Sequence, residues 1–175
     1  KISVNTVDRY ICALTDSYIF YKVDRYDVKG RMHLKTLGKF YIIDTGIRRM
    51  LSSGAAEDLG HLIENIVYFE LLRRGYKVYT GKVSKKEVDF VATSADEVLY
   101  CQVSASVLDE KTLQRELEPL KLIQDHHRKI LLTLDEIGAG RNFAGIKQLN
   151  LIEWLLKKVK TWFMKPQTGY LRRSL

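Results

Sequence analysis

Acidic and polar side chains recur between residues 60 and 104 in an order that suits divalent-metal chemistry. Glu64 lies among apolar residues of a helix-like segment, and Asp89 lies in the strand-like segment EVDFV at residues 87–91. Gln102 and Ser104 lie two apart in the next strand-like segment, so they share one face of that strand. A hard cation needs oxygen ligands that converge from different elements. This order predicts a metal-dependent nuclease core with Glu64, Asp89 and Gln102 as metal ligands.

The last part of this pattern is substituted. A nuclease core of this type reads Glu-x-Lys where this chain reads Gln102-Val103-Ser104. The Gln102 carbonyl binds a hard cation more weakly than a carboxylate, and Ser104 does not replace the charge of a lysine. Loss of a metal ligand or general base typically lowers a rate ~10²–10⁴-fold. We therefore expect Glu64, Asp89, Gln102 and Ser104 to form a degenerate catalytic site.

Three readings of the substitution stay open at this stage. The site could keep residual metal or phosphate binding without catalysis. A lysine or arginine from another position could supply the missing charge. Alternatively, the four polar residues form a buried hydrogen-bonded network that serves the fold alone. The candidate replacement cations lie on the following helix or just before Asp89: Lys111, Arg115, Lys85 and Lys86.

The first third of the chain resembles half of a winged helix. We expect a helix capped by Asn5 or Thr6, a strand at 18–23, a polar loop at 24–38 and a returning strand at 39–43. The loop and its borders are basic, and DNA would contact them. The predicted nucleic-acid contacts are Lys22, Arg25, Lys29, Arg31, Lys35 and Lys39.

The remaining elements predict a mixed α/β fold of the α+β kind. After a connector at 44–56 we expect a helix at 58–74, ended by Gly75. Further elements are expected in the order strand, strand, strand, helix, strand, strand, helix, with the last helix capped by Asn150. Their expected ranges are 76–80, 86–93, 97–104, 109–124 (capped by Asp109), 130–134, 145–149 and 150–160. We divide the chain into a winged-helix-like segment with its connector (1–56), a core (57–160) and a basic tail (161–175).

Composition restricts the classes of protein. In 175 residues, 46% are apolar and two are proline, which favours a packed core. Cys12 and Cys101 have no metal-ligand spacing, so a reduced, cytoplasmic setting is expected. No apolar run is long enough to cross a membrane, and no phosphate loop for ATP is present. The first residue is Lys1, which suggests a piece of a longer protein.

The net charge of +8 is unevenly distributed. Residues 1–57 carry +4, residues 58–153 carry −2, and residues 154–175 carry +6. Overall basicity is therefore weak support for DNA bound on the core, and it points instead to the first third and to the tail.

Several motifs together resemble the C-terminal region of a bacterial and archaeal family of AAA-type ATP-binding proteins. The motifs are YDVKG at 26–30, KFYIIDTG at 39–46, EN at 64–65, ELLRRGY at 70–76 and EVDFV at 87–91. In that family an ATPase module precedes a winged-helix segment and a restriction-endonuclease-like, PD-(D/E)XK-like domain of unknown function. The resemblance implies that Glu64, Asp89 and Gln102 occupy the acidic positions and Ser104 the lysine position. It also implies that the N-terminal ATPase module is the natural partner.

These observations lead to a functional expectation with two alternatives. The expected function is a non-catalytic accessory domain of an AAA-type ATPase that binds nucleic acid or a protein partner. The first alternative is a DNA endonuclease that uses Mg²⁺ or Mn²⁺ at Glu64, Asp89 and Gln102. The second is a protein-interaction or oligomerisation module.

Overall fold

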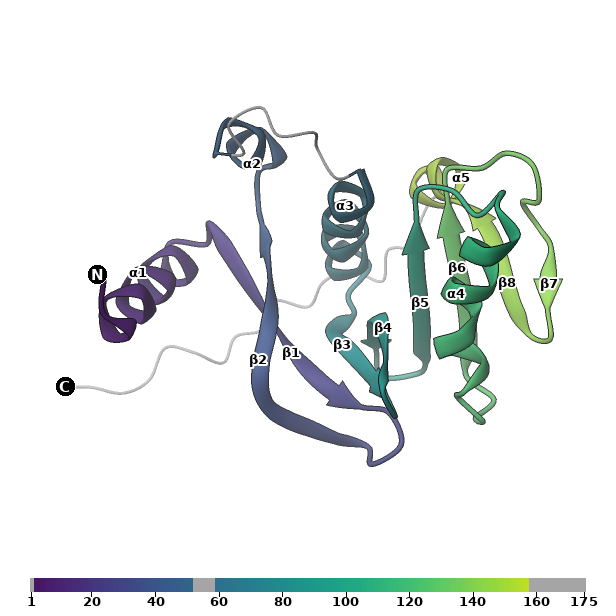
Figure 1. The fold of residues 1–175 in the computed structure, drawn as a ribbon, viewed down its shortest axis with the longest axis horizontal. Helices are drawn as coiled ribbons and strands as arrows, with labels where there is room; N and C mark the ends of the chain where they lie inside the picture. The colour runs from purple at the N-terminus through teal and green to yellow at the C-terminus, as the bar shows by residue number, and fades with distance from the viewer. Residues whose placement is uncertain (1, 52–58, 158–175) are drawn as a thin grey trace.

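A single mixed β-sheet forms the centre of the molecule (Figure 1). The structure is a computed structural model that describes residues 2–51 and 59–157, without the side chains of residues 35–37 and 51. The described strands follow the order β2-β1-β3-β4-β5-β6-β8-β7 across the sheet. The predicted mixed α+β class is confirmed.

The bounds of the elements are as follows. The strands are β1 Phe20–Asp27, β2 Met32–Ile42, β3 Lys77–Val83, β4 Lys86–Thr93, β5 Val98–Ser104, β6 Arg128–Thr133, β7 Asn142–Phe143 and β8 Ile146–Asn150. The helices are α1 Val4–Asp16, α2 Thr45–Leu51, α3 Leu59–Arg73, α4 Glu110–Lys121 and α5 Leu151–Leu156. No helix of the described residues is long and apolar enough to span a membrane.

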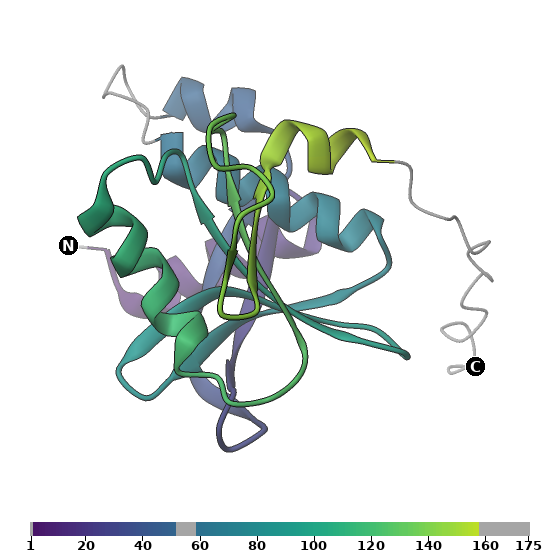
Figure 2. The same ribbon diagram turned by 90° about the vertical axis from the view of Figure 1, so that its right-hand side faces the viewer.

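Helices bury both faces of the sheet. Figure 2 shows α4 on one side and α3 with α5 on the other. Val67 and Leu71 of α3 are fully buried against one face, with Phe90 beneath them. Leu117 and Leu120 of α4 are fully buried against the opposite face. Two apolar layers therefore hold the sheet in place, as expected for an α+β sandwich.

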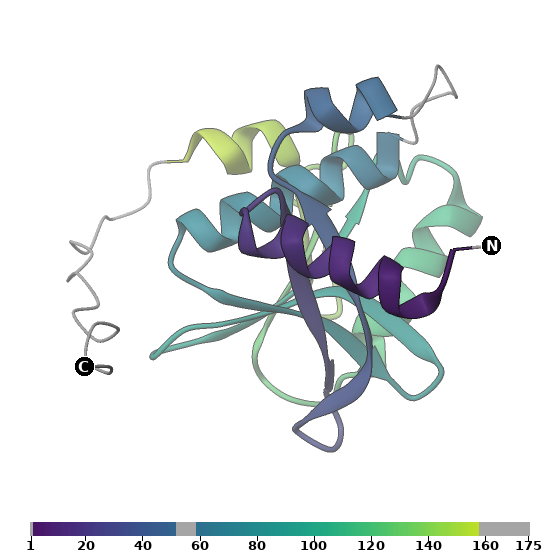
Figure 3. The same ribbon diagram turned by 90° about the vertical axis from the view of Figure 1, so that its left-hand side faces the viewer.

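The N-terminal hairpin is an integral part of this sheet. β1 pairs with β2 in antiparallel fashion and with β3 in parallel fashion, through Arg25, Tyr26 and Asp27. The sheet thus runs across the boundary predicted at residue 56, and α1 lies against β1 at the sheet edge (Figure 3). The helix–strand–strand order was predicted, but residues 24–27 and 32–38 lie in strands where a loop was expected. Both edges of β1 are paired, which accounts for the longer strands.

Several predicted ends of helices differ from the structure. Ser3 caps α1, because its side chain accepts a hydrogen bond from the Thr6 amide. The expected connector contains α2, whose first turn is capped by the Asp44 carboxylate. α5 ends at Leu156, although a helix through residue 160 was predicted. Residues 158–160 and the predicted basic tail at 161–175 lie outside the described residues, as does Asp58.

Other local predictions are confirmed. Asp109 caps α4 and Asn150 caps α5 through side-chain hydrogen bonds to backbone amides. Gly75 has φ of 86° after α3, the left-handed conformation that ends a helix at low cost for glycine.

Asn65 ties α3 to the hairpin. Its side-chain amide donates to the Ile42 carbonyl at 2.9 Å, and its side-chain oxygen accepts from the Ile42 amide at 3.0 Å. The side chain is buried, so it satisfies two backbone groups at the end of β2 that lie beyond the reach of solvent.

We predict that Asn65→Ala lowers the free energy of unfolding by about 2 kcal/mol, because both Ile42 backbone groups lose their partner. Urea denaturation followed by circular dichroism would measure this change. Gln124→Ala, an exposed amide truncated in the same way, is the matched control and should change stability little. Equal stability of the two variants would contradict the bridging role of Asn65.

Candidate active site

A pocket of about 560 Å³ opens between α3, α4 and the ends of β4 and β5. The structure brings all four predicted catalytic positions to this pocket. Glu64 comes from α3, Asp89 from β4, and Gln102 and Ser104 from β5. Three elements, α3, β4 and β5, therefore bring these four residues together, as the spacing of polar residues predicted.

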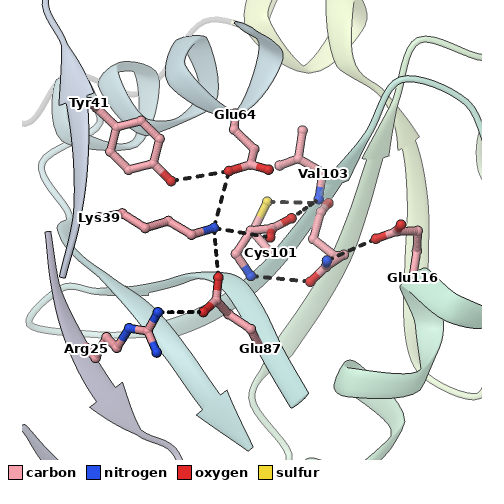
Figure 4. A network of polar contacts seen from close by, with 10 residues as sticks. Arg25, Lys39, Tyr41, Glu64, Glu87, Cys101, Val103 and Glu116 are labelled. Atoms are coloured by element: carbon pink, nitrogen blue, oxygen red, sulfur yellow. Dashed lines mark hydrogen bonds and ion pairs between the residues drawn. The ribbon is translucent and has the colours of Figure 1, made fainter. Parts of the chain in front are cut away.

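The Lys39 ammonium group lies among the acidic side chains (Figure 4). Its Nζ atom is 2.8 Å from Glu87, 3.4 Å from Glu64 and 4.0 Å from Asp89. Lys39 is on β2, 25 residues before Glu64 in the chain. Although burial lowers the pKa of Lys39, the neighbouring carboxylates outweigh this effect and raise it. Lys39 is therefore firmly protonated, and it supplies a positive charge that Ser104 does not.

The backbone before Lys39 requires glycine. A Cβ atom on Gly38 would lie 2.0 Å from the carbonyl oxygen of Val23, so a side chain at this position would collide with β1. The register of the β1–β2 pair also shifts between Val23 and Arg25. This close approach and irregular pairing set the position of Lys39 at the pocket.

Two further residues contact the carboxylates around Lys39. The Tyr41 hydroxyl donates to Glu64 at 3.4 Å, and burial together with the Glu64 charge raises the pKa of Tyr41. Arg25 contacts the second oxygen of Glu87 at 3.3 Å. Glu87 thus binds one cation from each strand of the hairpin (Figure 4).

The Asp89 carboxylate is nearly enclosed. One oxygen accepts a hydrogen bond from the Val103 amide at 2.9 Å, and the other faces Lys39. Burial raises the pKa of Asp89, the adjacent Glu64 carboxylate raises it further, and Lys39 compensates only in part, so that the pKa is about 8. The pocket therefore holds more negative charge than Lys39 neutralises.

Gln102 does not point its carbonyl toward the acidic pair. Its carbonyl oxygen accepts from the Asp89 amide at 3.3 Å, and its NH₂ group donates to Glu116 at 3.0 Å. Arg115 holds the other oxygen of Glu116 at 2.8 Å. Gln102 is therefore a bridge between the backbone of β4 and a buried carboxylate of α4.

The other predicted contributors lie apart from the acidic pair. Ser104 lines the pocket, but its hydroxyl donates to the Ser106 carbonyl at 3.0 Å. Of the candidate replacement cations, Arg115 lines the pocket and Lys86 pairs with Glu118 at 2.9 Å. Lys85 and Lys111 are exposed. The cation beside Glu64 and Asp89 is therefore Lys39 and none of these four candidates.

The predicted basic contact surface is divided in the structure. Lys22 pairs with Asp24, while Arg25 and Lys39 take part in the acidic cluster. Lys29 and Arg31 lie in the exposed turn between β1 and β2. Lys35 lies in β2, and its side chain is outside the described residues.

The donor set suits a small, hard cation that keeps some of its water. Within residues 2–51 and 59–157, no three His, Cys, Asp or Glu side chains form a cluster that could hold a metal ion by themselves. Glu64 and Asp89 nevertheless share one pocket. Mg²⁺ is commonly bound by one or two carboxylates together with water and substrate phosphate. These two carboxylates fit such an ion, whereas the Gln102 carbonyl is already engaged.

Sequence reasoning missed three members of the polar network: Lys39 as the partner of the carboxylates, Tyr41 and Glu116. Lys39 and Tyr41 lie two apart on β2, so the sequence predicts that their side chains share one face of the strand. Glu116 had a weaker signal, since it lies on the apolar side of α4 between Leu113 and Leu117. Their convergence on Glu64 and Gln102 depends on strand and helix packing that spacing alone does not encode.

Comparisons with known proteins give two matches. Residues 1–58 match a family described as "Domain of unknown function (DUF8612)". A Haemophilus influenzae protein, described as "Uncharacterized protein", is 39% identical over 155 residues, which covers 89% of this chain. The chain spans 38% of the length of that relative. No solved structure matches. The segment matched by the family includes β1, β2 and Lys39, the cation that contacts Glu64 and Glu87.

We predict that Asp89→Asn stabilises the protein at pH 8 in the presence of EDTA by about 1 kcal/mol. The folded-state pKa of Asp89 is raised above its ordinary value of 3.8, so the native state binds this proton more tightly than the unfolded chain does. The stability that this proton provides is present at low pH and is lost as the pH rises toward about 8. The advantage of the variant should therefore shrink toward pH 5, as urea denaturation at several pH values would show. A pH-independent difference would contradict this account.

Proposed function

We propose that the pocket is a nuclease-type site that hydrolyses phosphodiester bonds of DNA with the help of Mg²⁺ or Mn²⁺. One observation carries the proposal: the Lys39 ammonium lies 3.4 Å from Glu64 and 4.0 Å from Asp89. Two carboxylates and a lysine are the groups that such a site requires. In this proposal Lys39, on β2, supplies the positive charge that Ser104 lacks.

The role of Lys39 follows from its protonation. Because neighbouring carboxylates raise its pKa, Lys39 does not serve as a general base near neutral pH. It would instead stabilise the negative charge that develops on the phosphate in the transition state. Such a fixed charge in a partly buried site typically contributes ~10²–10³-fold in rate.

Glu64 and Asp89 would hold the cation, which when bound would polarise the phosphate and lower the pKa of an attacking water. The Val103 amide fixes one oxygen of Asp89, and Lys39 and Tyr41 both contact one oxygen of Glu64. These contacts orient the two carboxylates before substrate arrives. Gln102 fixes the backbone of Asp89 in the same way and is a positioning residue in this proposal.

The proposal includes a longer protein to which this chain belongs. The chain would act within a longer cytoplasmic protein that carries an AAA-type ATPase module, and the restriction-endonuclease-like assignment of the core belongs to the same proposal. Support comes from the motifs at 39–46 and 87–91 and from the length of the Haemophilus protein, of which the chain spans 38%. The ATPase module would be the partner and DNA the substrate.

A second candidate is a non-catalytic accessory domain that binds nucleic acid or a protein partner. A specific contact favours it: Lys39 is closest to Glu87, at 2.8 Å, and Glu87 also binds Arg25. In this reading the ammonium neutralises the acidic cluster and joins the hairpin to the core. The two functions differ in what removal of Lys39 does to cleavage.

We predict that the wild-type chain nicks supercoiled plasmid in Mn²⁺, and that Lys39→Met lowers the rate about 100-fold. Asp89→Ala should lose cleavage, because a carboxylate that binds the cation is removed. Lys111→Met, an exposed lysine of α4, is the matched control and should cleave normally. Agarose gel densitometry over time would give the rates.

Lys39→Arg separates catalysis from fold stability in this experiment. An arginine keeps the positive charge, so stability should stay close to that of the wild type, while the altered position of the charge should keep cleavage low. If Lys39→Met cleaves the plasmid at the wild-type rate, the proposed role of Lys39 is excluded. If the wild type cleaves nothing and Mn²⁺ does not raise its melting temperature, the nuclease proposal is wrong and the second candidate stands.

We also predict that Gln102→Glu lowers the free energy of unfolding by about 2 kcal/mol, because a second carboxylate then faces Glu116 without a donor. The double variant with Glu116→Gln restores the hydrogen bond with the roles exchanged, so its stability should return toward that of the wild type. Urea denaturation would test the exchange. An equal loss in the single and double variants would show that these two positions do not contact each other.

A further inference from the structure

Three aromatic rings lie side by side on the sheet face that α4 covers only in part. Tyr26 of β1 is 5.6 Å from His33 of β2 and 5.9 Å from Tyr79 of β3, and His33 is 4.9 Å from Tyr79. The main contacts of α4 with the sheet are with β4, β5, β6 and β8. The rings are thus beside the helix, with His33 exposed and both tyrosines half-buried. We call Tyr26, His33 and Tyr79 the aromatic row.

Two cations lie between Tyr26 and His33 in the chain. Lys29 and Arg31 form the turn between β1 and β2, which projects at the bottom of Figure 1. Both line a groove of about 400 Å³ that Val83 and the segment 122–125 close on the other side. The acid in that groove, Asp125, is engaged by Tyr100 at 2.6 Å and by Lys129 at 3.3 Å. Within the described part of the chain, neither Lys29 nor Arg31 forms an ion pair.

The backbone at Arg31 is strained. Its φ angle is 50°, in the left-handed region that glycine or asparagine adopts more easily than arginine. Gly30 precedes it, and the Asp27 carboxylate binds the amides of Lys29 and Gly30 at 3.1 and 3.2 Å. A long cation at a position that favours glycine suggests a use for its side chain.

We infer that the aromatic row and this turn form a binding surface for single-stranded nucleic acid. Bases would stack on His33, Tyr26 and Tyr79, and the phosphates beside them would pair with Lys29 and Arg31. Stacking on aromatic side chains combined with a basic groove is the common physical basis of single-strand binding.

Charge complementarity selects this occupant. A duplex hides its base faces, so it would use Lys29 and Arg31 but not the rings. A protein partner with an apolar surface would leave the two cations without acidic partners. A polyanion with exposed aromatic faces satisfies both features of the surface, and single-stranded DNA or RNA has that chemistry.

This surface deepens the proposed function, because it specifies a single-stranded segment as the form of nucleic acid that is held. It uses no residue of the Glu64–Asp89–Lys39 pocket. Binding measured in EDTA therefore tests the surface even if the pocket does not cleave.

The experiment is fluorescence anisotropy of a labelled fifteen-residue oligothymidylate in EDTA, with a duplex of the same length beside it. His33→Ala should weaken binding to the single strand about tenfold. Arg31→Gly should also weaken it and should lower the slope of log affinity against log salt by about 0.7. The melting temperature of Arg31→Gly should be equal to or above that of the wild type, because glycine relieves the strained backbone. Lys147→Gln on β8, an exposed cation at the far side of the sheet, is the matched control.

Each outcome decides the inference. Loss of single-strand binding in His33→Ala and Arg31→Gly, with normal binding in Lys147→Gln, supports the surface. Equal binding of duplex and single strand, or normal binding by His33→Ala, overturns it. If Asp89→Ala has no effect on cleavage while His33→Ala loses binding, the nuclease proposal fails and the surface stands. If Asp89→Ala loses cleavage while His33→Ala binds the single strand normally, the inferred surface fails and the nuclease proposal stands.

Discussion

The ammonium group of Lys39 is the cation shared by carboxylates from two different elements of the fold. It connects β2 to Glu64 of α3 and to Glu87 and Asp89 of β4. Buried like charges repel each other strongly unless a counter-charge lies between them, and removing one partner of such a cluster leaves the others uncompensated. The close approach of these carboxylates, and with it the shape of the pocket, therefore depends on a cation from the N-terminal hairpin. Asn65 fixes the same hairpin through uncharged hydrogen bonds.

The two sides of the pocket differ in what they supply. On the side of α3 and the hairpin, acidic groups outnumber cations, and the raised pKa of Asp89 reflects this surplus. On the side of α4, the hydrogen bonds of Gln102 and the contacts of Arg115 satisfy Glu116 completely. The side of α3 and the hairpin can therefore still accept a positive ligand. On the side of α4, the carboxylate oxygens of Glu116 already have hydrogen-bond donors. The amide of Gln102 can bridge the Asp89 backbone and Glu116, whereas a carboxylate at this position would repel Glu116.

Sequence reasoning recovered the convergence of Glu64, Asp89, Gln102 and Ser104, since the helix and the two strands that carry them have clear apolar periodicity. It placed Lys39 in a basic surface because its neighbours in sequence, Lys35 and Arg31, are basic. Local pattern cannot show that the face of β2 carrying Lys39 is turned toward α3, because that orientation follows from the parallel pairing of β1 with β3. Likewise, the amide of Gln102 looked like a weakened ligand, and only the packing of α4 gives it another partner.

The parallel pairing of β1 with β3 extends over three residue pairs, the shortest of the parallel pairings in the described sheet. The hairpin is thus attached by a narrow seam, and it carries Lys39 and Arg25 while the core carries the carboxylates. Separation of β1 from β3 would withdraw both cations from the acidic residues. The neutralisation of Glu64, Glu87 and Asp89 therefore depends on a hairpin whose strand pairing with the core is only three residue pairs long.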